Sequence, residues 1–229
     1  MILVTGGTGF IGRSLIRSLI SSGETVRVLL RPSKKSPSFP KGVSVEVAVS
    51  SFSDEQSLRA AIKDVDVVYH LASAERMGLK GDLNQIDVDG TATLVKACKA
   101  SAVKRIIYVS HHGADRGSAY PVMKAKGIAE NWIINSGIPY TILRTGAVFG
   151  PGDQFTLPIV RLLRLMPFFF LIPEEGSALL QPIWVEDLVT CMTLSLEDSR
   201  KVNRILQIGG IESISYLDIV KMIMRQAGI

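Results

Sequence analysis

Hydrophobic and polar positions follow two alternating periods along the first two thirds of the chain, and these predict strands and helices in turn. Apolar runs of about four to eight residues are typical of buried strands, and apolar positions three or four residues apart indicate helices. The expected strands are Ile2–Thr5, Thr25–Leu30, Val43–Val49, Asp66–His70, Arg105–Ser110 and Tyr140–Arg144. The expected helices are Phe10–Ser22, Ser53–Lys63, Gln85–Ser101, Pro121–Ser136 and one that begins at about Tyr216.

Two of these helices carry a start signal in the sequence. Ser53 precedes Gln56 by three residues, and Ser215 precedes Asp218 by the same interval. A serine hydroxyl at such a position accepts a hydrogen bond from a backbone amide of the first turn, and the later polar side chain reaches back. We therefore expect Ser53 and Ser215 to be the helix caps.

The alternation of strand and helix predicts the fold class. Repeated βαβ units form a parallel sheet with helices on both faces, joined by right-handed crossovers. The pattern weakens after Gly150-Pro151-Gly152. We therefore expect an α/β protein with a doubly wound parallel sheet over residues 1–150. A small C-terminal lobe over residues 151–229 is expected to interleave with that core.

Composition is consistent with a globular protein, since 47% of the 229 residues are hydrophobic and 21% are charged. The most apolar stretch, Leu157–Ile172, contains Arg161 and Arg164 and is interrupted by Pro158 and Pro167. It is too short and too charged to predict a transmembrane segment. The amino-terminal residues lack the pattern of a secretory signal. The expected location is the cytoplasm.

The net charge of +5 is modest, and basic residues gather only at Arg31, Lys34, Lys35 and Lys41. No nucleic-acid-binding signature accompanies them, so no nucleic-acid partner is expected. Cys98 and Cys191 lie far apart and outside any metal-ligand spacing. They are interpreted as reduced thiols, and no metal site is predicted.

The first candidate site is the glycine-rich turn between the first strand and the first helix. Gly6, Gly9 and Gly12 have the spacing G-x-x-G-x-x-G, and Gly7 adds the spacing G-x-G-x-x-G. Glycines let the backbone approach a pyrophosphate, and the free amides of the helix start then bind it. The predicted dinucleotide-binding residues in this turn are Gly6, Thr8, Gly9, Phe10, Ile11 and Gly12.

The residue after the second strand bears on which dinucleotide binds. An acidic side chain there usually accepts the ribose hydroxyls of NAD, whereas this chain has Arg31, with Lys35 nearby. A guanidinium suits an additional phosphate. We therefore expect NADP in preference to NAD, with a solvated basic loop as the alternative interpretation.

The second candidate site combines Tyr120, Lys124 and Ser110. Tyr120 and Lys124 are four residues apart and so lie on one face of the expected helix. A neighbouring ammonium favours the ionised phenol, so Tyr120 is a candidate acid or base. Ser110 ends a strand and is a candidate for orienting a substrate carbonyl. His70 is interpreted as a core or cofactor-flanking residue. His111 and His112 are interpreted as residues of the active-site loop, with contact to substrate as the alternative.

These segments resemble the extended and atypical short-chain dehydrogenase/reductases over nearly the whole chain. The resemblance rests on Thr5–Gly12, His70–Ser73, Tyr108–Ser110, Tyr120–Lys124, Gly150–Asp153, Gln181–Asp187 and Ile208–Gly210. Within that superfamily the chain is most similar to the NAD-dependent epimerase/dehydratases, to the branch of the 39 kDa subunit of respiratory complex I, and to NmrA-like redox sensors.

The resemblance implies a Rossmann core and cofactor contacts from Leu71, Ala72 and Ser73. It also implies a triad in which Tyr120 exchanges a proton with substrate, Lys124 holds the nicotinamide ribose and Ser110 positions the substrate. The family's C-terminal lobe usually continues beyond the equivalent of Ile229, so a lobe that is either truncated or reduced is expected.

Two functions follow from the resemblance. The first is an NAD(P)-dependent oxidoreductase or epimerase/dehydratase that acts on a small carbonyl, sugar-like or lipid-like substrate. The second is a cofactor-binding redox sensor or assembly subunit without turnover, which the departures from the family pattern at Ser50-Ser51, Asp87 and Thr145 favour. The apolar stretch 165–172 is interpreted either as a partner or membrane-surface contact or as buried core. A homodimer through the helices at 85–101 and 121–136 is expected for a relative of this family, although these helix faces could equally belong to the core.

Overall fold

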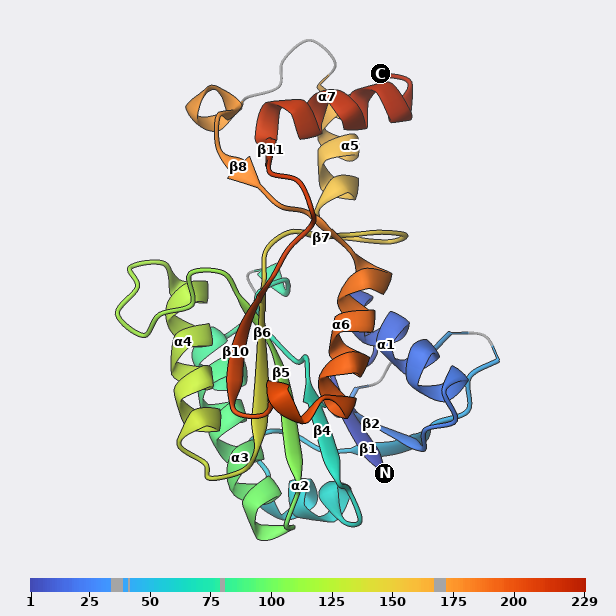
Figure 1. Ribbon diagram of the computed structural model, residues 1–229, viewed down its shortest axis with the longest axis vertical. Coiled ribbons are helices and arrows are strands. Elements are labelled where there is room, and N and C mark those ends of the chain that lie inside the picture. The colour runs from blue at the N-terminus through green and yellow to red at the C-terminus, as the bar shows by residue number, and fades with distance from the viewer. Residues whose placement is uncertain (34–38, 41, 79–80, 167–171) are drawn as a thin grey trace. The chain divides into compact units, whose positions relative to one another are not determined.

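The computed structural model describes every residue except 34–38, 41, 79–80 and 167–171 (Figure 1). The described residues fall into two compact units. The first consists of residues 1–144 and 189–207, and the second of residues 145–188 and 208–229. The division expected at residue 150 stays a prediction.

The first unit contains a seven-stranded sheet in the order β10-β6-β5-β4-β1-β2-β3 (Figure 1). Its strands are β1 (Ile2–Thr5), β2 (Val26–Leu30), β3 (Glu46–Val49), β4 (Val67–His70), β5 (Arg105–His111), β6 (Tyr140–Thr145) and β10 (Arg204–Ile208). β1 pairs in parallel with both β2 and β4, so the chain winds outward from the centre of the sheet in both directions. The predicted doubly wound fold is therefore confirmed.

Helices cover both faces of this sheet. The helices are α1 (Phe10–Ser21), α2 (Glu55–Ile62), α3 (Gly90–Ala100), α4 (Pro121–Ile134) and α6 (Val185–Glu197). Consecutive strand residues point to opposite faces. On β4, Tyr69 hydrogen-bonds to the carbonyl of Met192 in α6, while His70 hydrogen-bonds to Thr91 in α3. These bonds place α6 and α3 on opposite faces, and α2, α3 and α4 pack beside one another.

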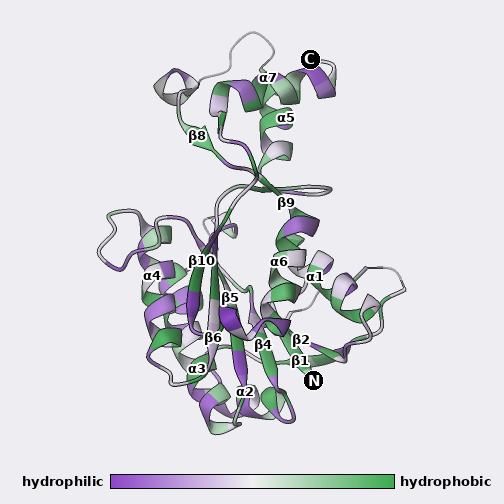
Figure 2. Cartoon of the chain, in the orientation of Figure 1, coloured by the Kyte–Doolittle hydropathy of each residue, from purple (hydrophilic) through white to green (hydrophobic). Residues whose placement is uncertain are grey.

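The core of this unit lies between the sheet and the α2–α3–α4 layer. Leu3, Val68 and Ile106 from three neighbouring strands are almost completely buried, together with Leu58 of α2 and Leu94 of α3. Full burial of such a side chain contributes about 1.5–3 kcal/mol to stability. The helices carry both hydrophobic and hydrophilic residues along their length, as amphipathic helices do (Figure 2).

The second unit has two short two-stranded sheets and two helices. Its regular elements are β7 (Val148–Phe149) paired with β9 (Ile183–Trp184), β8 (Leu179–Leu180) paired with β11 (Ile214–Ser215), α5 (Thr156–Leu165) and α7 (Tyr216–Ala227), with a 3-10 turn at Pro173–Gly176. Ile159 and Leu163 of α5 pack against Val220 of α7. Part of the apolar stretch interpreted above, residues 167–171, lies outside the described residues.

Most predicted elements are confirmed, with small shifts at their ends. The cap at Ser215 is confirmed, because its hydroxyl accepts a hydrogen bond from the amide of Asp218. The prediction that Ser53 caps α2 is wrong. The carboxylate of Asp54 accepts the hydrogen bond of the first turn of α2, while the Ser53 hydroxyl bonds to that of Ser51.

Several further elements differ from the prediction. The expected strand at Val43–Val49 begins only at Glu46, and the helix expected from Gln85 begins with a π-helical segment, Asn84–Asp89. α5, α6 and β10 were not predicted, because the sequence pattern weakens in that part of the chain.

None of the described helices is both long enough and apolar enough to cross a bilayer. Within the same described part of the chain, no cluster of three or more His, Cys, Asp or Glu side chains is placed to hold a metal ion.

Candidate functional site

The glycine-rich turn between β1 and α1 is a conformation that side chains would block. Gly6 adopts φ +69°, and a Cβ on this residue would lie 2.7 Å from the carbonyl carbon of Leu71. A Cβ on Gly12 would lie 2.4 Å from the Gly6 oxygen and 2.7 Å from the Gly7 Cα. Because these neighbours are backbone atoms, the turn requires glycine at both positions.

The start of α1 offers unpaired backbone amides to a ligand. Gly9 is the N-cap, no side chain in the described part of the chain caps the helix, and no acidic residue lies in its first turn. The first amides of a helix, here those of Phe10 and Ile11, have no acceptor within the helix. Thr8 and Gly9 are exposed, so a phosphate can reach these amides and the positive end of the helix dipole.

Thr5 and His70 hold the loop that follows β4 beside this turn. The Thr5 hydroxyl accepts hydrogen bonds of 3.2 Å from the amides of both Leu71 and Ala72. It lies 2.8 Å from Nδ1 of His70, so its own hydrogen is available only to that nitrogen. Burial, and then the positive charge of Lys126, lowers the pKa of His70 to about 3. The imidazole is therefore neutral, with Nδ1 as the acceptor.

The same network continues from His70 into the helix layer. The Thr91 hydroxyl donates to the backbone carbonyl of Asp87 and lies 2.9 Å from Nε2 of His70, which assigns the imidazole hydrogen to Nε2. The carboxylate of Asp87 is completely buried and accepts a hydrogen bond of 2.8 Å from the amide of Ala74. Thr5 and Asp87 thus fix both ends of the predicted cofactor loop, Leu71–Ser73.

Lys126 is a buried charge that the sequence analysis missed. Its ammonium lies 3.2 Å from the Asp87 carboxylate and 5.3 Å from the ring centre of Tyr108, and the side chain is only 6% exposed. Burial alone would lower the pKa of Lys126, but Tyr108, Asp87 and Glu75 raise it to about 12. Lys126 therefore stays charged beneath the cofactor loop.

A sequence signal for Lys126 exists. Lys126 and Glu130 are four residues apart and alternate with Ala125, Ala129 and Ile133, all of which are buried in α4. Polar residues at helical spacing on a buried face indicate paired charges, because a charge is rarely buried alone.

Glu130 determines the role of Ser110. The Ser110 hydroxyl donates a 2.5 Å hydrogen bond to one oxygen of Glu130, and Arg144 contacts both oxygens of that carboxylate at 2.9 and 2.6 Å. The hydrogen bond to Glu130 raises the pKa of Arg144, so the guanidinium stays charged. A hydroxyl has one hydrogen, and that of Ser110 is committed to Glu130. The Ser110 hydroxyl can therefore accept a hydrogen bond from a ligand, but it has no hydrogen left to donate to one.

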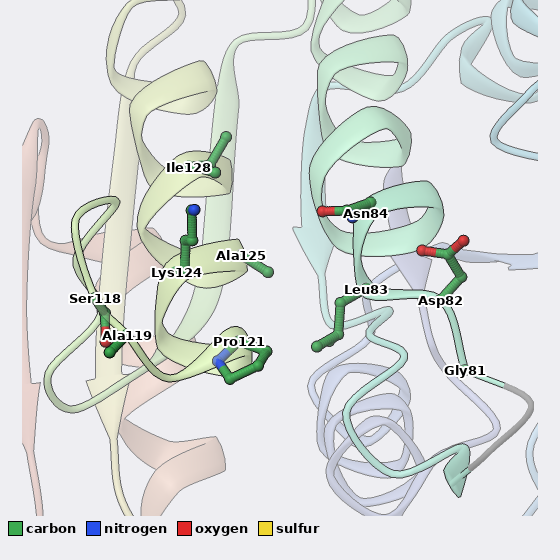
Figure 3. A pocket seen from close by; sticks show the side chains of 10 residues that line it. All are labelled: Gly81, Asp82, Leu83, Asn84, Ser118, Ala119, Pro121, Lys124, Ala125 and Ile128. Carbon is green, nitrogen blue, oxygen red and sulfur yellow. The ribbon is translucent and has the colours of Figure 1, made fainter.

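Among the described residues, neither Tyr120 nor Lys124, the other two members of the predicted triad, forms a hydrogen bond with Ser110. Tyr120 is the N-cap of α4, and its side chain is 74% exposed. Lys124 lines a cavity of about 720 Å³ between the start of α4 and residues 81–84 (Figure 3). Asp82 and Asn84 lie on the other side of this cavity (Figure 3). Lys124 and Lys126 face different surroundings because two residues turn a helix by about 200°.

Arg31 follows β2 as predicted and is exposed. Its guanidinium lies 3.5 Å from the sulfur of Met77, in the segment that follows the cofactor loop. Arg31 therefore reaches across the carboxyl ends of β2 and β1, where ligands bind in parallel sheets of this kind. Lys35, the second residue predicted for the additional phosphate, lies outside the described residues.

These features fit a dinucleotide. The turn closes only with glycine, the helix start has free amides, and the adjacent loop is fixed by buried hydrogen bonds. The predicted contacts of individual residues with the cofactor, and the predicted roles of Tyr120 and Lys124, stay predictions.

Comparison with known proteins agrees with this site. The profile of a family described as NAD(P)H-binding matches residues 6–154. The chain is 27% identical over 228 residues to a Photosystem II assembly factor, Ycf39, of Cyanophora paradoxa, covering 99% of the chain and 68% of that protein. It is 28% identical over 187 residues to a ceramide reductase of Caulobacter vibrioides, covering 82% of the chain and 58% of that protein.

A solved structure has the same fold. The UDP-glucose 4-epimerase of Thermotoga maritima superposes with a TM-score of 0.81 at 22% identity, covering 99% of this chain and 82% of the epimerase. The predicted similarity to the epimerase/dehydratase fold is therefore confirmed.

Proposed function

The chain belongs to the NAD(P)H-binding family, and we propose that it is an oxidoreductase that prefers NADP(H) and reduces a carbonyl group of a small or lipid-like substrate. The observation that carries the cofactor part is the uncapped start of α1 behind the glycine turn, with Arg31 beyond the end of β2. Free amides suit the pyrophosphate, and the guanidinium suits an additional phosphate on the ribose.

A bound reduced nicotinamide supplies a hydride to a carbonyl carbon. The chain's contribution is to bind and orient. The amides of Phe10 and Ile11 would hold the pyrophosphate, Arg31 would hold the ribose phosphate, and Leu71–Ser73 would contact the remainder of the cofactor. Lys126, paired with Asp87, would support that loop from the protein interior.

The substrate class is supported by a relative rather than by this chain's own contacts. The Caulobacter relative is described as a ceramide reductase, and this chain spans 58% of its length. A reaction of that kind on a lipid-like carbonyl is therefore the first to test.

The test is the consumption of NADPH in the presence of ketones of increasing chain length. Turnover should appear with wild-type protein, increase with chain length and disappear in Gly12→Ala, whose turn cannot close. Turnover that is the same in Gly12→Ala would show that the activity belongs to a contaminant.

The second candidate function is a cofactor-binding assembly factor without turnover. The exposed position of Tyr120 favours it, because a phenol that is 74% exposed at a helix end is poorly placed for protected proton transfer. Similarity to a protein described as a Photosystem II assembly factor supports it as well. Tight NADPH binding without turnover on any ketone of the series would favour this function over the first.

A further inference from the structure

Helix α5 of the second unit has leucine side chains on its outward face. Its inward face is formed by Ile159 and Leu163, which are buried and pack against α7 (Figure 1). Leu157, Arg161 and Leu165 are four residues apart and therefore lie together on the opposite side of the helix. Leu165 is 80% exposed, and Leu157 is exposed as well. A helix on the surface of a folded unit usually turns polar residues outward, so this face is unusual.

Two further apolar side chains enlarge this exposed surface. Leu162 lies beside the outward face, and Met166 is the C-cap that follows Leu165 at the end of the helix. Both are exposed. Single exposed leucines are common on protein surfaces, but four large apolar side chains on one short helix indicate a surface that contacts another body.

Helix α7 provides a comparison within the same unit, because it packs against α5 and is of similar length. Its exposed residues are Asp218, Lys221, Met222, Arg225 and Gln226. They include charges of both signs, and the Lys221 ammonium lies 3.7 Å from the Asp218 carboxylate. The outward face of α7 is therefore that of an ordinary surface helix, and the leucine-rich outward face is a property of α5.

The charges on α5 are of one sign. Arg161 and Arg164 are its charged residues, and both are exposed. No ion pair or hydrogen bond joins either guanidinium to another residue in the part of the chain that the structure describes. The nearest acidic residues in the sequence are Asp153 and Glu174. The Asp153 carboxylate is buried and accepts hydrogen bonds from backbone amides at the start of α5. The two arginines are therefore available to an external anion.

The position of Arg161 between Leu157 and Leu165 decides which kind of partner fits this face. An apolar groove of another protein would bury the guanidinium together with the leucines, and burial of an unpaired charge is costly. At the surface of a bilayer, leucines enter the apolar region while the stem of an arginine lies along them and its guanidinium stays among the headgroups. A guanidinium also binds a phosphate group through two parallel hydrogen bonds.

We propose that α5 binds this protein to the surface of a bilayer that contains anionic phospholipids. The exposed leucines enter the interface, and Arg161 and Arg164 contact the lipid phosphates. The helix lies in the plane of the surface and does not cross the bilayer, because its 10 residues extend over only about 15 Å. The contact requires neither cofactor nor turnover, so its test is independent of the proposed function.

The test is co-sedimentation of the full chain with phospholipid vesicles. One set of vesicles contains phosphatidylcholine alone, and the other contains phosphatidylcholine mixed with phosphatidylglycerol. Binding to the mixed vesicles should be roughly 30-fold tighter, since each arginine near an anionic surface contributes about fivefold. This preference should decrease as salt is added, because salt screens the charges. Absence of binding, or equal binding to both sets of vesicles, would overturn the proposal.

Variants locate the contact on α5. Arg161→Gln/Arg164→Gln should lose the roughly 30-fold preference, and Leu165→Ser should weaken binding by about tenfold or more. The matched control on α7, Lys221→Gln/Arg225→Gln, should stay within about twofold of wild type. All of these side chains are exposed, so the urea midpoints should equal that of wild type, which separates lost binding from lost folding.

Two outcomes would assign the vesicle contact or the α5 face differently. Equal losses in the α5 and α7 double variants would show that general charge, and not α5, carries the binding. A dimer in gel filtration that Leu165→Ser dissociates, in protein that does not bind vesicles, would assign the face to a second copy of the chain. Either result would overturn the proposal.

Discussion

The buried pair Lys126–Asp87 gives the most direct test of the site's internal architecture. Replacement of Lys126 by Met preserves the length and most of the volume of the side chain but removes its charge. The Asp87 carboxylate, which is completely buried, then loses its counter-ion at 3.2 Å, and the amide of Ala74 is the one hydrogen-bond donor that remains to it among the described residues. A buried carboxylate in that condition is destabilising in the folded state.

Removal of one partner of a buried ion pair typically costs about 3–5 kcal/mol. In a chain of this size each kcal/mol lowers Tm by about 2–4 °C, so Lys126→Met is expected to lower Tm by roughly 6–20 °C. Lys124→Met is the matched control two residues away. Lys124 is exposed, and the expected change in its unfolding free energy is within about 0.5 kcal/mol.

The assay is urea unfolding of wild type, both single variants and the double variant Lys126→Met/Asp87→Asn. The asparagine keeps an oxygen for the Ala74 amide but has no charge, so the double variant should recover much of the loss. The reasoning is refuted if Lys126→Met is no less stable than Lys124→Met. It is also refuted if Asp87→Asn, added to Lys126→Met, lowers the free energy of unfolding further instead of restoring part of it.

Three further predictions concern the cofactor site and its surroundings. Gly12→Ala should weaken NADPH binding by at least about tenfold in calorimetry, because its Cβ would lie 2.4 Å from the Gly6 oxygen; an unchanged affinity in folded protein would contradict the account of the turn. Arg31→Ala should weaken NADPH binding by about 10- to 100-fold and leave NADH binding unchanged, since a hydrogen bond to a charged group contributes about 1.5–3 kcal/mol; equal losses for both nucleotides would argue against a phosphate contact. The third concerns His70, whose pKa falls from about 6.5 to about 3 on folding, so the unfolded chain binds a proton that the folded chain does not. Stability should therefore fall by up to about 1.4 kcal/mol per pH unit as pH decreases from about 6.5 towards 3. Urea unfolding between pH 6.5 and 5 should show a smaller slope in His70→Gln, and an equal slope would exclude His70 as the cause.

The central part of the fold could be predicted because its signals are local. Most strands from β1 to β6 are short apolar runs, although β3 is mostly exposed, and each helix between them has apolar residues at helical spacing. The glycine turn was predictable for the same reason, since its residues are contiguous. The later elements β10 and α6 could not be predicted, because their contacts are with residues far away in the sequence, such as that of Met192 with Tyr69.

The chemistry of the site was less predictable than the turn. The spacing Tyr120–Lys124 is correct for one helix face, but a spacing does not say which face is buried. Packing against β5 turns Lys126 and Glu130 inward and leaves Lys124 at an outer cavity. The commitment of the Ser110 hydrogen to Glu130 depends on a contact across 20 residues, which no local pattern contains.

The central claim is that the turn at Gly6–Gly12 binds a nicotinamide dinucleotide and that Arg31 selects the phosphorylated form. Calorimetric titration of the full chain with NADPH and NADH tests it most directly. The account predicts binding of one cofactor molecule per chain, tighter for NADPH by at least about tenfold, in line with a charge-assisted contact to the additional phosphate. No heat of binding for either nucleotide, or equal or tighter binding of NADH, would contradict it.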